Sequence, residues 1–161
     1  MFEYEGDLNQ FLIAGLERVV ADIPEDRLNE RAPGNGHPPV WVLGHLVVVA
    51  EMGLQIFGQR PEHLHWFKIF GPGSSDDVPD AESYKKAELL DCIVSSYPRL
   101  CEAARNADPE RLGQPHGVAL LEGTPIATFG QLTSHILTSH LSFHLAQLSA
   151  WRRAAGFTHL F

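Results

Sequence analysis

The sequence predicts an all-α protein: a four-helix bundle with a long crossover between its second and third helices. Four stretches carry apolar residues at helical spacing, and no segment alternates convincingly as a surface strand would. About two dozen residues separate the second stretch from the third, which a plain up-and-down meander would not need. With 161 residues, 44% of them hydrophobic and 20% charged, the chain is expected to form one domain over residues 1–161.

The first helix is expected to begin near Asp7, where the pattern D-x-x-Q resembles a capping box, and to end before Pro24. Its apolar residues recur at the spacing of an amphipathic surface helix, namely Leu8, Leu12, Leu16 and Val19.

The second helix is expected to open with Pro38 and Pro39, because proline suits the first turn, and to run to about Gly58. Its apolar residues lie nearly all round the helix, which predicts burial on most sides. A buried strand over residues 40–50 is the alternative, but the apolar run continues too far for a typical strand.

A crossover loop is expected over residues 59–80, where Gly, Pro, Ser and Asp cluster. The third helix would start near Asp80 or Ser83 and end before Asp108, with a kink at Pro98. Its expected buried face is Leu90, Ile93, Val94, Tyr97, Cys101 and Ala104. After a second loop, Thr128 to Gln131 forms a capping box for the fourth helix, and Gly156 is expected to cap its end.

Composition excludes several classes of function. A formal net charge of -8 makes binding to nucleic acid or to an anionic membrane unexpected. The apolar run PVWVLGHLVVVA is interrupted by His45 and closed by Glu51, short of the ~18 apolar residues of a membrane span. The acidic start MFEYEGDLNQ is unlike a secretory signal, and Cys92 and Cys101 suggest neither a disulfide framework nor a zinc site. A cytoplasmic location is expected.

Nine histidines stand out, and three of them lie in the fourth helix. At about 100° per residue, His140 and His144 share one face and can bind one ion together, whereas His135 is rotated about 140° from His140 and should point elsewhere. The shared face also carries the core-facing apolar residues, so both imidazoles are expected to enter the bundle interior.

His45 is the best candidate for a third ligand. It lies in the apolar segment WVLGHLVVV, where an isolated polar ring would cost a few kcal/mol of desolvation, and Gly44 beside it would allow a close helix approach. If the second and fourth helices face each other, His45, His140 and His144 supply three nitrogen ligands and leave other positions open, as in catalytic metal sites. Hydrogen-bonded core histidines are the alternative.

The other polar candidates are weaker. His63 and His65 flank Trp66 in the crossover and are interpreted as surface histidines rather than a ligand pair. Trp66, Phe67 and Phe70 are expected to seal the bundle rather than to form a lid, and His37, His116 and His159 to be solvated. No general base is evident: Glu51 points about 120° away from His45, and nothing places Glu122 or His116 at the site.

The segments WVLGHL and SHLSFHLAQLSAWRR together resemble the DinB-like superfamily, the DinB/YfiT-related four-helix bundles. The resemblance spans nearly the whole chain in helix order and includes the long connection after the second helix. It implies a metal site with one histidine on the second helix and an H-x-x-x-H pair on the fourth, which here are His45, His140 and His144. It also places the family's H-x-G-Q tail on residues 144–147, with Ala146 in place of the glycine.

Gln147 is therefore a candidate cofactor-binding residue, able to hydrogen-bond a ligand, a water or a substrate; an ordinary polar helix residue is the alternative. The implied cofactor is a divalent metal ion, zinc or nickel first and iron or manganese next, and a low-molecular-weight thiol is also compatible with the family.

The resemblance implies a metal-dependent hydrolase or a thiol-dependent S-transferase acting on a small molecule, with unknown catalytic residues. A non-catalytic metal- or ligand-binding stress-response protein is the second hypothesis, and a metal-free helical interaction module is the third. A homodimer is plausible for such bundles, and nucleic acid is not an expected partner.

Overall fold

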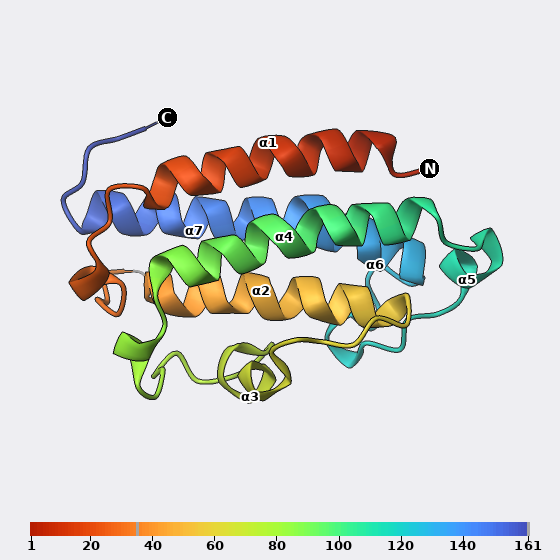
Figure 1. The fold of residues 1–161 in the computed structure, drawn as a ribbon, viewed down its shortest axis with the longest axis horizontal. Coiled ribbons are helices and arrows are strands. Elements are labelled where there is room, and N and C mark those ends of the chain that lie inside the picture. The colour runs from red at the N-terminus through yellow and green to blue at the C-terminus, as the bar shows by residue number, and fades with distance from the viewer. Residues whose placement is uncertain (35, 161) are drawn as a thin grey trace.

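The computed structural model describes residues 1–34 and 36–160, and in it four long helical rods lie side by side (Figure 1). The first three rods are α1 (Glu3–Val20), α2 (Pro39–Ile56) and α4 (Lys86–Arg105). The fourth is continuous through α6 (Phe129–His135), the π-helical segment η5 (Ile136–His140) and α7 (Leu141–Ala154). The described residues form no strand, only an isolated bridge between Pro115 and Thr128. The predicted all-α four-helix bundle is confirmed.

The order of the helices explains the crossover. α1 and α2 each pack against both α4 and α7. Figure 1 shows that α2 and α4 run in the same direction, so the chain must return along the bundle between them. This return carries the short turns η2 (Leu64–Trp66), α3 (Phe67–Phe70) and η3 (Ala81–Ser83). The predicted crossover is therefore present, although it contains more helical turns than its composition indicated.

The first helix begins one turn earlier than predicted, at Glu3 rather than near Asp7. Phe2 is buried and anchors the start, while Glu3 and Glu5 suit the positive end of the helix dipole. The buried face also differs from the predicted one, because Leu8 is 53% exposed and the core positions are Asn9, Ile13, Leu16, Val19 and Val20. The apolar residues of this helix exceed what one core face can bury.

The second helix is as predicted, with Pro38 at the N-cap and Pro39 in the first turn. By length and composition α2 could cross a membrane, contrary to the sequence expectation, but 83% of its apolar window is buried inside the protein. Contact with α4 and α7 on one side and with the crossover turns η2 and α3 on another accounts for its apolar character, since a helix covered on several sides is buried nearly all round.

The third long helix begins at Lys86, after the turn η3, and not at Asp80 or Ser83. Its buried face is shifted from the predicted one: Val94 is 40% exposed, and Pro98 lies inside the helix on the exposed side. The buried residues are Leu89, Ile93, Ser96, Tyr97, Leu100, Cys101 and Ala104.

Shorter turns close the ends of the bundle, namely η1 (Glu25–Arg27), α5 (Pro109–Gly113) and η4 (Ala119–Leu121). The capping box of Thr128 and Gln131 is present, and Gly156 has the positive φ of a helix end cap. Arg152 is buried and pairs with Asp22, which ties the end of α7 to the end of α1.

Candidate metal centre

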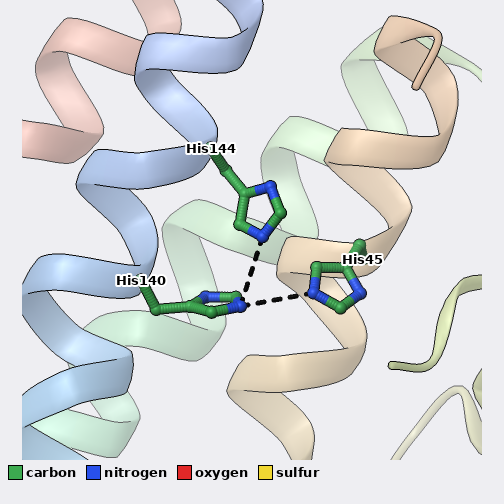
Figure 2. A group of neighbouring side chains, drawn as sticks. All are labelled: His45, His140 and His144. Carbon is green, nitrogen blue, oxygen red and sulfur yellow. Dashed lines mark hydrogen bonds between the residues drawn. The ribbon is translucent and has the colours of Figure 1, made fainter. Parts of the chain in front are cut away.

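Three histidines from two neighbouring rods meet inside the bundle. His45 comes from α2, and His140 and His144 come from the junction of η5 with α7 (Figure 2). His140 Nε2 lies 3.3 Å from His45 Nε2 and 3.2 Å from His144 Nε2. All three ligand atoms lie within 4.8 Å of one another, so these side chains could hold one metal ion. The predicted meeting of the three imidazoles is present, and their role as ligands stays a prediction.

Hydrogen bonds orient two of the rings with their Nε2 atoms toward the centre. His45 Nδ1 lies 2.6 Å from the carbonyl oxygen of Phe70, and His144 Nδ1 lies 2.7 Å from Gln147 Oε1. Both oxygens can only accept, so each Nδ1 carries the proton and each Nε2 presents a lone pair. Metal-ligating histidines commonly donate their second ring nitrogen in this way. Gln147 therefore holds a ligand candidate in position.

Without a cation, the three Nε2 atoms at the centre cannot all be satisfied by hydrogen bonds to one another. A proton on His140 Nε2 can be donated to only one of the two facing lone pairs. The buried Nδ1 of His140 has no hydrogen-bond partner among the described residues. A cation between the three nitrogens would accept a lone pair from each of them, and three neutral imidazoles form a donor set suited to zinc or nickel. The residues present therefore fit a divalent metal.

Burial keeps the three rings neutral. Desolvation, followed by the neighbouring imidazoles, lowers the pKa of His140 from its ordinary 6.5 to about 2. The same causes lower the pKa of His144 to about 4, although its bond to Gln147 opposes the shift. Burial also lowers the pKa of His45, against the opposing effect of the Phe70 carbonyl. At neutral pH each ring thus has the deprotonated form that a metal requires.

The π-helical segment corrects the expectation for His135. In a π-helix the hydrogen-bonding partner lies five residues away, so positions five apart nearly overlie each other. Because η5 spans residues 136–140, the ring of His135 packs edge-on against that of His140, with centroids 5.6 Å apart. His135 is half-buried beside the site and its Nδ1 lies 2.7 Å from Ser139 Oγ. The regular helical rotation used for the prediction does not apply here.

A buried asparagine supports this segment and was not identified from the sequence. Asn9 of α1 is 2% exposed, and its side-chain amide donates to the carbonyl oxygen of Leu137 at 2.8 Å. Leu137 lies within η5, where the regular α-helical hydrogen bonds are interrupted. The available signal was a polar residue one turn before Ile13 and two turns before Leu16, on one face of an amphipathic helix.

Gly44 provides room for the crossover against α2. A Cβ at this position would lie 2.5 Å from Cδ1 of Phe70, and Phe70 is fully buried. The close approach predicted at Gly44 is therefore made by an aromatic ring of the crossover and not by another helix. This contact places the Phe70 carbonyl against His45. On the same helix, Trp41 stacks between the rings of His37 and His45, at centroid distances of 3.9 and 4.6 Å.

The crossover aromatics seal the bundle, as expected, because Trp66 and Phe70 are buried. His63 is not a free surface histidine, since its Nδ1 lies 2.7 Å from the carboxylate of buried Glu51 and its ring stacks on Trp66. His65 is exposed, as expected. Glu51 thus fastens the crossover to α2 instead of facing the three histidines.

No general base is evident at the centre among the described residues. His116 is half-buried rather than solvated, with Nε2 donating to the carbonyl oxygen of Ile126 and Nδ1 accepting from the amide of Val118. Both ring nitrogens are therefore used by the loop backbone. Glu122 is exposed, as is His159, while His37 is half-buried against Trp41.

Comparison with known proteins agrees with this architecture. No curated protein matches the sequence. The family model described as the DinB superfamily matches residues 10–148, a range that begins within α1, ends within α7 and includes the three histidines. The chain belongs to the DinB superfamily.

Proposed function

We propose that His45, His140 and His144 bind a divalent metal ion and that this chain is a metal-dependent hydrolase or thiol-dependent S-transferase acting on a small molecule. The observation that carries the proposal is the convergence of three Nε2 atoms, two of them with hydrogen bonds that leave the lone pair facing the centre. Such a bound ion, held by three nitrogens with positions left open, supplies Lewis acidity that can activate water or a thiol.

The chain's own residues would set up the reaction. Phe70 and Gln147 hold two of the rings in the required tautomer, and the buried surroundings keep all three neutral. The crossover, fixed by the hydrogen bond between Glu51 and His63, covers the α2 side of the centre. Among the described residues no side-chain base faces the centre, so in this proposal the water or thiol loses its proton to bulk solvent or to the substrate.

The test combines metal analysis with activity. Protein purified without an affinity tag or chelator should contain about one divalent ion per chain, and His140→Ala should lose it. His65→Ala is the matched control, because His65 is exposed and outside the site. Panels of esters and amides, and of thiols with electrophiles, should show saturable turnover that is lost in His140→Ala alone.

Two outcomes would contradict parts of the proposal. Full metal occupancy without turnover across both panels would favour the non-catalytic metal-binding protein. Identical unfolding curves with and without added zinc would favour a metal-free module, because a ligand that binds only the native state must raise its stability.

A further inference from the structure

A cavity lies beside the three histidines and shares His140 with them. Its volume is about 340 Å³, within the range of pockets that bind small molecules. The walls are mostly apolar and come from α2, from the turn η4 and from α6 with η5, as Met52, Leu121 and Phe129 illustrate. Since one wall is a candidate metal ligand, a molecule in this cavity would lie against the proposed centre.

Among the described residues that line the cavity, Arg111 is the one Lys, Arg, Asp or Glu, and it is exposed to solvent at the rim. No aspartate or glutamate lines it among the described residues, although the chain contains 20 acidic residues and has a net charge of -8. Because the acidic groups lie elsewhere, the one charge facing the cavity is positive. Charge complementarity therefore favours an anionic group on the occupant.

Arg111 is held in place without being neutralised. Its guanidinium carbon lies 4.1 Å from the centroid of the Phe129 ring, its Nη1 donates to Gln114 Oε1 at 2.9 Å, and its Nη2 donates to the carbonyl oxygen of Ile56 at 3.4 Å. Among the described ion pairs none involves Arg111, and its remaining N–H groups can bind a carboxylate in bidentate geometry. A monoanion is favoured over a phosphate dianion, since Arg111 is the one cationic Lys or Arg side chain that lines the cavity among the described residues.

An exposed leucine at the rim of the cavity gives a second indication of the occupant's chemistry. Leu120, in η4, lines the cavity although its side chain is 77% exposed. An exposed leucine at the mouth of an apolar cavity gains burial when an apolar molecule fills it. An occupant that suits both Arg111 and Leu120 is thus apolar in its body and carries one carboxylate.

We propose that this cavity binds a small-molecule substrate that has an apolar body and one carboxylate, with Arg111 as the residue that binds the carboxylate. The proposal names the substrate class of the proposed function and rests on it for the reaction. The binding itself does not require the metal, so the two can be tested separately.

The test uses three probes that share a phenylbutyl skeleton and differ in the terminal polar group: 4-phenylbutanoate, 4-phenylbutan-1-ol and 4-phenylbutan-1-amine. Calorimetry on zinc-loaded and on chelator-treated protein should show the carboxylate binding about tenfold tighter than the alcohol, and the amine weakest. Arg111→Gln should remove this preference and leave the affinity for the alcohol within about twofold. Arg153→Gln is the control, because it removes the same charge from an exposed arginine outside the cavity.

Two further variants keep the test valid if Arg111→Gln unfolds. Arg111→Lys retains the charge but loses the planar fork, so the preference for the carboxylate should shrink without disappearing. Leu120→Ser changes an exposed side chain and should weaken the binding of carboxylate and alcohol by the same factor.

Two results would overturn the proposal, and a third would refute the proposed function alone. A carboxylate preference that survives Arg111→Gln and vanishes with the chelator would assign the anion to the metal. Failure of all three probes to bind folded protein would exclude the cavity as a site for this class. Arg111-dependent binding in protein that takes up no metal would leave the cavity assignment intact and refute the proposed function instead.

Discussion

The substitution Gly44→Ala tests whether the contact between α2 and the crossover positions the histidine centre. The added Cβ would lie 2.5, 2.6 and 2.7 Å from three ring atoms of Phe70, well inside van der Waals contact. The ring is fully buried, so it cannot swing into solvent. Because the carbonyl of the same residue holds His45 Nδ1 at 2.6 Å, displacing Phe70 should also disturb that ring.

The magnitude follows from two opposing effects. Overpacking a core typically costs about 1–3 kcal/mol, while replacing a helical glycine with alanine contributes about 1 kcal/mol. A net loss of about 1 kcal/mol is expected, which lowers Tm by roughly 2–4 °C in a domain of this size. Loss of an outer partner of a metal-ligating histidine should weaken zinc binding about 10- to 100-fold.

The assay pairs urea unfolding of chelator-treated protein with a competition titration for zinc. Gly15→Ala is the control, because its Cβ meets one methyl of Leu145 at 3.2 Å and no residue of the site. The control should keep wild-type zinc affinity. If Gly44→Ala stabilises the protein by about 1 kcal/mol and binds zinc like the wild type, the contact does not position His45 and the reasoning is wrong.

Four other predictions concern groups around the site and elsewhere in the bundle. Gln147→Leu should weaken zinc binding about 10- to 100-fold in a competition titration, because His144 loses its acceptor, and Gln147→Glu should restore it. Asn9→Ala should lower the free energy of unfolding by about 1–3 kcal/mol in urea, since the carbonyl of Leu137 loses its donor; no loss would mean that this bond does not support η5. Burial and nearby carboxylates raise the pKa of Cys92 to about 11, so iodoacetamide at pH 8 should alkylate it about 100-fold more slowly than the unfolded chain, as mass spectrometry can follow. The pKa values of the three site histidines are lowered in the native metal-free protein, so these rings stay neutral at pH values where the unfolded chain takes up protons. The free energy of unfolding of the metal-free protein should therefore decrease as the pH falls below about 6.5, by up to about 4 kcal/mol at pH 5.5. A flat pH profile would contradict the burial of these rings.

The histidine pair on the fourth rod illustrates what local spacing can predict. His140 and His144 are four residues apart, and their shared face follows from helix geometry alone. The position of His135 does not follow, because a π-helical segment changes the rotation between it and His140. That segment is stabilised in part by Asn9, which lies 128 residues from its partner Leu137.

The buried faces of α1 and α4 show a second limit. Periodicity identified both helices, but Leu8 and Val94 are exposed while Asn9 and Ser96 are buried. Both helices carry more apolar positions than their neighbours cover, so the choice of face depends on which helices pack against them.

The amino-acid sequence alone determined the helical class, the crossover and the identity of the three candidate ligands, because periodicity, proline positions and histidine spacing are local properties. Only the packed chain decided that Phe70 and Gln147 would orient two of the rings, that His135 would join His140, and that Arg111 would face an apolar cavity. The bond between His144 and Gln147 is local, but the other contacts are not. They depend on how several helices and the crossover pack together, or on a break in regular helix geometry. The spacing of residues in the sequence carries no information about the packing or about the break.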